Sequence, residues 1–199
     1  MTRILLASRN AKKLDELRRI LTPVSGIEVI GLADIPPYPE APETGATFDE
    51  NALAKARDAV AATGLIAVAE DSGLAIDALH GMPGVLSARW SGKHGDDQAN
   101  NDLVLAQLTD TPDDRRGAAF VCAAALATPT GQETVVHGTW PGTITRTPRG
   151  HNGFGYDPIF IPTNETRTSA ELDPEEKDSQ SHRGRALRQL VRYLREFAD

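Results

Sequence analysis

Two consecutive carboxylates, Glu70 and Asp71, come directly after an apolar run in the segment AVAEDSGLAID, residues 67–77. Acidic side chains are rare in strands and costly to bury alone. The segment therefore predicts either an exposed turn at Asp71 and Ser72, or a site for a cation. Mg²⁺ prefers oxygen ligands, commonly one or two carboxylates with water and substrate phosphates. A carboxylate pair can also supply a general base, because each charge raises the pKa of its neighbour.

Two further carboxylates, Glu40 and Glu43, lie in a segment with four prolines, residues 34–46, which predicts an irregular loop. Together with Glu70 and Asp71 they form the set of candidate metal ligands. Lys55 follows on the next expected helix, where an ordinary exposed lysine is the simplest interpretation.

The segment SRNAKKLDE, which begins at Ser8, lies at an expected strand-to-helix junction. Such a junction favours anions, because the first N–H groups of a helix have no partners within the helix and its dipole is positive there. Ser8 and Asn10 add hydrogen-bond donors, and Lys12 and Lys13 add positive charge. The glycines of a P-loop are missing. A helix N-cap followed by a solvated helix face is the alternative.

The glycine-rich segment GFGYDP, residues 153–158, predicts a loop that approaches a flat ligand. Glycines let a backbone come close to a ligand, and Phe154 or Tyr156 could stack on a ring. Asp157 could accept a hydrogen bond from an N–H group of a nucleobase. A turn with a core aromatic residue is the alternative.

A last polar cluster, EEKDSQSHRG at residues 175–184, places Lys177, His182 and Arg183 near the start of an expected helix. Ser181 is a good N-cap for that helix, so part of the cluster is structural. Taken together, the clusters provide a phosphate site, metal ligands, a loop for ring stacking and donors for a base edge. This combination predicts a magnesium-dependent enzyme that acts on a nucleotide.

The elements that position these clusters alternate between strands and helices, which predicts an α/β fold with a mixed sheet. Apolar runs predict the strands, and a capping box and a terminal glycine mark the ends of one helix. Strands are expected at residues 3–7, 65–69, 115–128, 133–140, 142–148 and 159–161, with a break at Trp140-Pro141-Gly142, and helices at 14–21, 47–63, 97–109 and 182–197.

Composition is that of an ordinary globular protein: 199 residues, 40% hydrophobic and 25% charged. This length fits one domain over residues 1–199. The net charge of -7 argues against binding to a nucleic-acid backbone. Cys122 has no partner for an intrachain disulfide, so we expect a buried thiol in a reducing compartment. No signal peptide or membrane span is visible, and we expect a cytoplasmic protein that binds neither nucleic acid nor membranes.

Five blocks resemble, in this order, a bacterial member of the inosine triphosphate pyrophosphatase family: SRNAKKLDE, ETGATFDENALAKA, AEDSGLAIDALHGMPGVLSAR, GFGYDPIF and SHRGRAL. The resemblance implies an elongated mixed β-sheet flanked by helices, two lobes with a central nucleotide-binding cleft, and a homodimer. It also implies hydrolysis of ITP, dITP and XTP to the monophosphate and pyrophosphate. That reaction cleans the nucleotide pool and keeps deaminated purines out of DNA and RNA.

The resemblance also implies roles for particular residues. Asp71 matches the catalytic aspartate, which activates water and contacts Mg²⁺, and residues 8–13 match the triphosphate-binding segment. The positions implied to hold substrate are Ser8, Arg9, Asn10, Ala11, Lys12, Lys13, Lys55, Ser72, Phe154, Gly155, Tyr156, Asp157, Lys177, His182 and Arg183.

Two features depart from the family pattern. Arg9 stands where many members have glycine, so either the backbone approaches the ligand less closely or Arg9 itself contacts phosphate. The proline-rich loop makes the second metal ligand hard to align; Glu40 is preferred slightly over Glu43, and Glu70 is expected to support Asp71. The alternatives are a septum-inhibitor-type pyrophosphatase for pyrimidine or modified nucleotides, and a nucleotide sensor without turnover.

Overall fold

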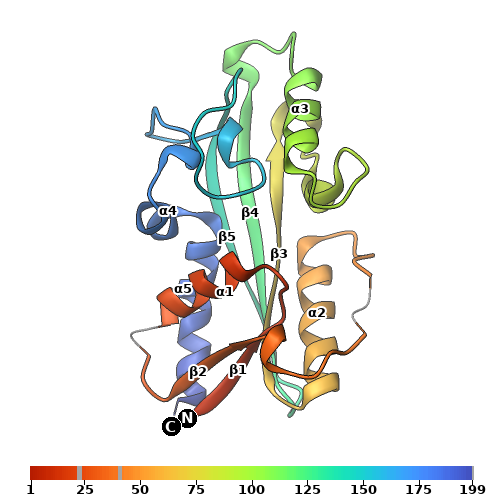
Figure 1. Ribbon diagram of the computed structural model, residues 1–199, viewed down its shortest axis with the longest axis vertical. Helices are drawn as coiled ribbons and strands as arrows, with labels where there is room; N and C mark the ends of the chain where they lie inside the picture. Colours follow the sequence, from red (N-terminus) through yellow and green to blue (C-terminus); the bar gives the residue numbers. More distant parts are fainter. Residues whose placement is uncertain (22–23, 40–41, 199) are drawn as a thin grey trace. The chain divides into compact units, whose positions relative to one another are not determined.

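The computed structural model describes residues 1–21, 24–39 and 42–198 (Figure 1). In these ranges the strands are β1 (Thr2–Leu6), β2 (Ile27–Gly31), β3 (Ile66–Ile76), β4 (Gly117–Ala127), β5 (Glu133–Ile144) and β6 (Phe160–Pro162). The α-helices are α1 (Ala11–Leu21), α2 (Phe48–Thr63), α3 (Asp97–Gln107), α4 (Pro174–Gln180) and α5 (His182–Leu194). The predicted α/β class is confirmed.

The strands form one mixed sheet in the order β2-β1-β3-β4-β5-β6. The three strands at one edge are parallel, since β1 pairs in parallel with both β2 and β3, with Leu5 opposite Ile30 and Ala67. Strand β6 pairs antiparallel with β5. The predicted mixed sheet with flanking helices is therefore confirmed, whereas the elongated form, the two lobes and the central cleft stay predictions.

Strand β3 is longer than the sequence suggested. It has 11 residues and continues through Glu70, Asp71 and Ser72 to Ile76. The alternative of an exposed turn at Asp71 and Ser72 is therefore wrong, and so is the expectation that the two acids lie at the end of the strand. The acids are tolerated inside a buried strand because each is bound by other side chains. Lys55 and Asn51 bind Asp71, and Arg183 binds Glu70.

Strand β5 also passes through an expected break, at Trp140-Pro141-Gly142. The carbonyl of Pro141 accepts a hydrogen bond from the backbone N–H of Thr163 at 2.9 Å, just beyond β6. The N and C=O of one strand residue point to the same side, so the missing N–H of Pro141 faces the end of this short edge strand. Proline is tolerated at such a position because no interior ladder bond is lost.

Two compact units make up the chain, and three strands contribute residues to both. The single domain expected over residues 1–199 stays a prediction. The first unit comprises Met1–Asp71, Cys122–Gly138 and Arg183–Asp199, and the second comprises Ser72–Val121 and Thr139–His182.

In the first unit, neighbouring residues of a strand pack against different helices. Ile4 of β1 lies in one buried cluster with Leu17 of α1 and Leu187 of α5. Leu5 lies in another cluster with Ala56 of α2. Figure 1 accordingly shows α1 and α5 on one side of these strands and α2 on the other. Burial of both faces explains why these strands are continuous apolar runs without alternation.

In the second unit, an aromatic cluster forms the centre of the core. The rings of Phe120 and Phe160 lie 4.6 Å apart at an angle of 63°, and Trp140 lies 5.5 Å from Phe160. Leu108 of α3 and Leu172 pack against the same cluster. Among the described residues, none of the helices has the length and apolar character needed to cross a bilayer.

Candidate active site

Helix α2 supplies two of the side chains that bind Asp71. The helix begins after Thr47, whose hydroxyl accepts a hydrogen bond from the first turn, and it ends at Gly64 with φ of 67°. Both predicted ends are confirmed. Asn51 and Lys55 are one helical turn apart and so lie on the same face.

The carboxylate of Asp71 accepts hydrogen bonds on both oxygens. Its Oδ1 lies 3.1 Å from Lys55 Nζ, and its Oδ2 accepts from Asn51 Nδ2 at 3.0 Å. Lys55 Nζ also donates to Glu43 Oε1 at 2.6 Å and to the backbone oxygen of Glu70 at 3.0 Å. One ammonium group therefore joins two of the candidate metal ligands, Glu43 and Asp71.

Burial and charge act in opposite directions on this group. Burial raises the pKa of Asp71, although Lys55 and Asn51 favour its ionised form. Burial lowers the pKa of Lys55, but the charges of Asp71 and Glu43 outweigh it, and that pKa is raised. Lys55 therefore stays cationic at neutral pH beside a carboxylate whose pKa is shifted toward neutrality, as is common in general bases.

Asp71 and Glu43 have the donor chemistry that Mg²⁺ requires. Their two negative charges share one ammonium group, so a net negative charge remains to attract a cation. In the part of the chain that the structure describes, no group of three or more His, Cys, Asp or Glu side chains is arranged as a metal site. A site with few protein ligands fits Mg²⁺, which commonly keeps waters and substrate phosphates as its other ligands. Glu40 lies outside the described residues.

Glu70 belongs to a different cluster, because successive side chains of a strand point to opposite faces. It is only 3% exposed. Its carboxylate accepts from Arg183 Nε at 2.7 and 2.8 Å, and Lys13 Nζ lies 3.5 Å away. Glu16 accepts from Arg183 Nη1 at 3.2 Å. The structure therefore does not bring the carboxylate of Glu70 together with those of Glu43 and Asp71.

The charges in this second cluster keep Glu70 ionised. Burial alone would raise its pKa, but the charges of Arg183 and Lys13 and hydrogen bonds lower the pKa to about 2. The thiol of Cys122 donates to Glu70 Oε2 at 3.3 Å, and burial followed by the Glu70 charge raises the thiol pKa. Cys122 is a buried free thiol, as predicted.

The predicted phosphate-binding segment, residues 8–13, covers the end of the connection from β1 and the first turn of α1. Asn10 Oδ1 accepts from the backbone N–H of Lys12 at 3.0 Å, and Ser8 Oγ accepts from the N–H of Asn10 at 3.2 Å. The capping alternative is thus correct for Asn10. Capping does not remove the positive end of the helix dipole, so the segment keeps the character of an anion site.

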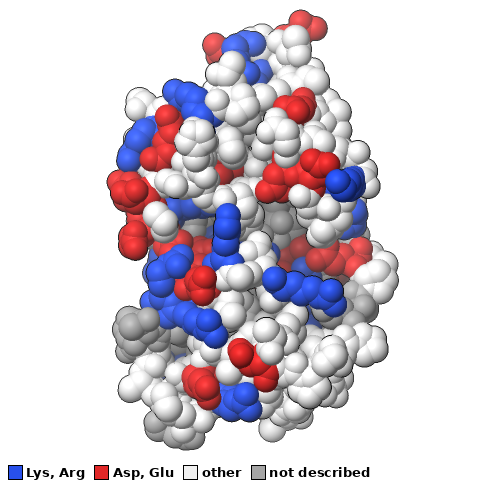
Figure 2. Space-filling model, viewed as in Figure 1, with Lys and Arg blue, Asp and Glu red and all other residues white. Residues whose placement is uncertain are grey.

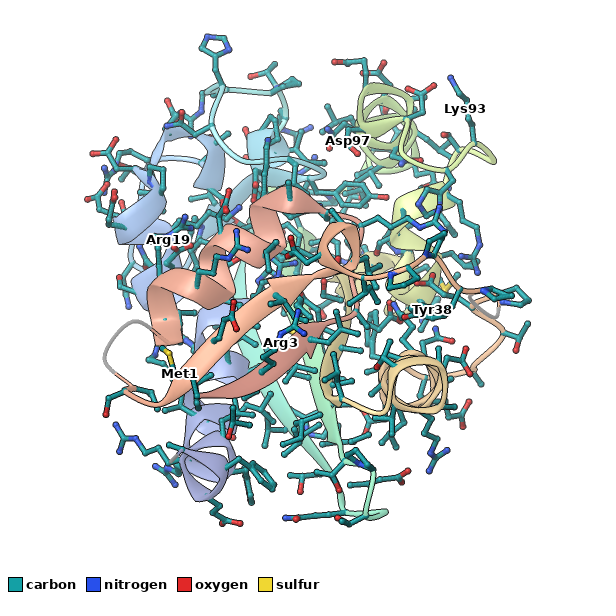
Figure 3. The ribbon with its side chains drawn as sticks, turned by 60° about the horizontal axis from the view of Figure 1, so that its bottom comes forward. Met1, Arg3, Arg19, Tyr38, Lys93 and Asp97 are labelled. Carbon is teal, nitrogen blue, oxygen red and sulfur yellow. The ribbon has the colours of Figure 1, made fainter. Side chains whose placement is uncertain are left out.

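A pocket of about 470 Å³ lies beside this segment. Arg9 and Ala11, both exposed, line it together with Ser8. Tyr38, labelled in Figure 3, lines it from the loop after β2. Arg9 therefore lies at an accessible surface beside the first turn of α1.

The glycine-rich loop of the second unit is organised around Asp157, which is 2% exposed. Asp157 accepts from the N–H of Phe154 at 2.8 Å, from Ser169 Oγ at 2.7 Å, and from Lys177 Nζ. The same ammonium group lies 5.2 Å from the centre of the Phe154 ring. A Cβ on Gly153 would clash with the Asp157 carboxylate, and the φ of 76° at this position also favours glycine.

Helix α3 binds the backbone of Gly155, in the same loop, through both its N–H group and its carbonyl. The N–H of Gly155 donates to Asp97 Oδ2 at 2.7 Å, and Asn101 Nδ2 donates to the Gly155 carbonyl at 2.9 Å. Asp97 lies on α3, as Figure 3 shows. Neither residue was predicted from the sequence; their one-turn spacing on an expected helix was the only signal.

The aromatic residues of the loop have different surroundings. Tyr156 is buried and donates its hydroxyl hydrogen to the carbonyl of Ser87 at 2.8 Å, so it is a core residue. Phe154 is half-buried and is the ring of this loop nearer to solvent. His182 is buried and stacks on Phe120, with ring centres 4.8 Å apart. Their contacts with substrate stay predictions, as does that of Ser72.

The family resemblance implies ITP as a substrate; if Asp157 positions Lys177 and Phe154 for it, Asp157→Asn should weaken its binding. Loss of the carboxylate removes the ion pair with Lys177, and we expect KM to rise about tenfold with a smaller change in kcat. Steady-state kinetics with ITP measures this. Ser169→Ala, which removes one neutral donor to Asp157, is the control and should raise KM less. Equal effects of both substitutions would contradict the ion-pair explanation.

The fold and the site together define an α/β protein with a carboxylate–lysine centre and a strand-to-helix anion site. The chain belongs to the Ham1 family, whose sequence model matches residues 4–193. It is 67% identical over 201 residues to the dITP/XTP pyrophosphatase of Nocardia farcinica, with 100% of this chain and 98% of the relative covered. It is 62% identical over 200 residues to that of Mycobacterium tuberculosis, with 100% and 98% covered.

Solved structures agree with the sequence relatives. The nucleoside-triphosphatase or dITP/XTP pyrophosphatase of Mycobacterium abscessus has 65% sequence identity and a TM-score of 0.79, with 96% of this chain and 99% of that chain covered. A HAM1 protein from Coxiella burnetii has 46% identity and a TM-score of 0.89, with 98% and 100% covered. The family resemblance predicted from the five sequence blocks is confirmed.

Proposed function

We propose that this protein hydrolyses the non-standard purine nucleoside triphosphates dITP, XTP and ITP to the monophosphate and pyrophosphate. The observation that carries the proposal is full-length similarity to a dITP/XTP pyrophosphatase, at 67% identity over 201 residues. The carboxylate–lysine centre around Asp71 supports the same reaction. The enzyme would remove deaminated purines from the nucleotide pool before they enter DNA or RNA.

In the proposed reaction, Asp71 orients a water molecule and accepts its proton while the water oxygen bonds to the α-phosphorus. The bond from that phosphorus to the oxygen bridging to the β-phosphate breaks, and pyrophosphate leaves. Lys13 and the first turn of α1 hold the triphosphate, with Ser8, Arg9, Asn10, Ala11 and Lys12 in the same segment. Lys55 keeps Asp71 and Glu43 in place and adds positive charge.

A divalent metal ion, Mg²⁺, is the proposed cofactor. Asp71 and Glu43 would hold it, and when bound it neutralises charge on the triphosphate. Glu70 is left out of this set because Arg183 and Lys13 surround its carboxylate.

Base selection is proposed to depend on hydrogen-bond donors. Lys177, His182 and Arg183 are the candidate donors to the 6-oxo group of hypoxanthine or xanthine, and Phe154 is the candidate stacking ring. Adenine has a 6-amino group, which would leave such donors unpaired. A mismatch of this kind can discriminate by up to ~10⁴–10⁵ in a well-built site.

A substrate panel with product identification tests the function. The protein with Mg²⁺ is incubated with ITP, XTP, dUTP, dTTP and GTP, and pyrophosphate, orthophosphate and monophosphate are measured. We expect pyrophosphate with ITP or XTP as the best substrate. A preference for dTTP would indicate the septum-inhibitor type, orthophosphate a phosphatase, and binding without product a sensor; each would refute the proposal.

Lys13→Ala should mainly weaken binding of the triphosphate. Removing one cation that contacts phosphate is expected to raise KM about tenfold, with a smaller fall in kcat. Steady-state kinetics with ITP provides the measurement. Lys93→Ala is the control, since Lys93 is 81% exposed and pairs only loosely with Asp96 at 3.4 Å. Unchanged kinetics in the Lys13 variant would contradict the phosphate assignment.

A homodimer is also proposed, on the family resemblance alone. Charged side chains of both signs are interspersed on the face that Figure 2 shows, so charge does not mark the interface there. Light scattering coupled to size exclusion should give twice the chain mass of 21.4 kDa. A mass of one chain at micromolar concentration would refute the dimer.

A further inference from the structure

We propose that Asn51 is the positioning residue of the active site, which fixes the Asp71 carboxylate and ties the loop carrying Glu43 to it. The inference rests on the function proposed above, in which Asp71 activates water. Neither the composition nor the motifs of the sequence marked Asn51 as a functional residue.

The side-chain amide of Asn51 uses both ends, and each end binds a different part of the site. Its Nδ2 donates to Asp71 Oδ2 at 3.0 Å, and its Oδ1 accepts from the backbone N–H of Gly45 at 2.8 Å. A carboxylate only accepts and an N–H only donates, so the two partners determine the orientation of the amide. Asn51 is 2% exposed, and reversing the amide would leave buried polar groups unpaired.

These contacts close a ring of interactions. Asn51 binds Asp71, Asp71 binds Lys55, and Lys55 binds Glu43. Two residues after Glu43, the backbone of Gly45 returns to Asn51. A Cβ on Gly45 would lie 2.6 Å from Asn51 Oδ1, so this close approach requires glycine. The ring holds the two carboxylates at one place although the loop contributes one and β3 the other.

Asn51 and Lys55 act differently on Asp71. Lys55 is shared with Glu43 and the backbone of Glu70, and it reaches Asp71 through a long side chain with four rotatable carbons. The amide of Asn51 is short, buried and oriented by two partners, so it fixes the plane of the carboxylate. A base that must face its water molecule needs such a fixed orientation, because small misplacements reduce the rate strongly.

A substitution at Glu50, the residue before Asn51, can distinguish the positioning of Asp71 from the ordering of the loop. Glu50 Oε2 accepts from the backbone N–H of Ala46 at 2.7 Å, so Glu50 also ties the loop to the start of α2. Glu50 is exposed, and its hydrogen bonds in the described part of the chain join Ala46 and Thr47. Glu50→Ala therefore removes a loop contact of the same kind and leaves the carboxylate contact intact.

The test compares Asn51→Asp with Glu50→Ala in the full chain. Asn51→Asp keeps an acceptor for the N–H of Gly45 but replaces the donor to Asp71 by a second carboxylate. We expect kcat for ITP about 10- to 100-fold below wild type with KM within about threefold, whereas Glu50→Ala keeps kcat within about twofold. Calorimetry with an α,β-methylene analogue of ITP, without metal, should give a Kd within about threefold of wild type for both variants.

A double substitution tests whether Asn51 acts through Asp71. In the Asp71→Asn background, Asn51→Asp should lower kcat by less than about threefold, because the group that it positions is already lost. Independent, multiplicative losses would overturn the inference. Asn51→Ser, which is smaller than the native residue, replaces Asn51→Asp in the same comparisons if thermal unfolding shows that Asn51→Asp does not fold.

Failure of this inference is distinguishable from failure of the proposed function. Wild-type protein that releases no pyrophosphate refutes the proposed function. Active wild-type protein whose Asn51→Asp and Asn51→Ser variants keep the wild-type kcat refutes only the role of Asn51. An equal loss of kcat in Glu50→Ala would also overturn it, since loop order rather than the Asp71 contact would then explain the effect.

Discussion

Asp71→Asn is expected to lower kcat for hydrolysis of ITP by about 10²–10⁴-fold, with little change in KM. Asparagine has the same shape as aspartate but cannot accept a proton from water at neutral pH. Its side-chain oxygen can still accept a hydrogen bond from Lys55 or Asn51, so β3 and α2 should keep their places. The loss is therefore expected in the chemical step rather than in binding of the triphosphate.

The same substitution at Asp49 provides a matched control for Asp71→Asn. Asp49 lies on the same helix as Asn51 and Lys55, and its Oδ1 is 2.8 Å from His137 Nε2 in an exposed pair. Asp49→Asn should leave kcat within about twofold of wild type, because exposed ion pairs contribute little. Near-wild-type kcat for Asp71→Asn would exclude Asp71 as the base, and a rise in KM alone would assign it to binding.

Local signals in the sequence were sufficient for several parts of the structure. The start and end of α2 follow from Thr47 and Gly64, and the connection at residues 8–13 follows from an apolar run next to a helical pattern. These features depend on interactions between residues close in the chain. The family blocks also singled out Lys55 as a substrate contact, which stays a prediction. From the residues alone its simplest interpretation was an exposed lysine, whereas its ammonium group binds Asp71.

Partners that are distant in the sequence explain what could not be predicted. Arg183 and Glu70 are 113 residues apart, and their pairing allows an acidic residue to stay inside β3. A hydrogen bond from Asn51, 20 residues away, likewise allows Asp71 to stay in the strand. Propensity alone favours a turn at two acids followed by serine and glycine, and these tertiary contacts override it. Strand β2, Ile27–Gly31, was missed because a five-residue edge strand gives little periodic signal.

The alternation of side chains along β3 gives the two acids different surroundings and different roles. Asp71 faces α2, where Asn51 and Lys55 bind it. Glu70 faces the opposite side, where Arg183 binds it, so an expected metal candidate is instead the buried partner of an arginine. Strand periodicity predicts opposite faces only once the strand is known to continue past the acids.

Glu70→Gln is therefore expected to act on stability, and to do so with a defined pH dependence. Glu70 has a pKa lowered from 4.5 to about 2, by the charges of Arg183 and Lys13 against the cost of burial. A carboxylate with a lowered folded pKa stabilises the fold above its unfolded pKa, and this stabilisation is lost as pH falls toward the folded pKa. The shift corresponds to about 3 kcal/mol at pH 7, and removing one partner of a buried ion pair costs a similar amount.

Urea unfolding from pH 7 to pH 2 measures this effect, with Glu133→Gln as the matched control. Glu133 binds Arg57 at 2.7 Å, as closely as Glu70 binds Arg183, but that pair is exposed. We expect Glu70→Gln to lower the free energy of unfolding by about 3 kcal/mol at pH 7, and Glu133→Gln by about 0–1 kcal/mol. The difference between wild type and Glu70→Gln should shrink between about pH 4.5 and pH 2, because wild-type Glu70 becomes protonated over that range. A difference that does not change with pH would show that Glu70 contributes through packing and not through its charge.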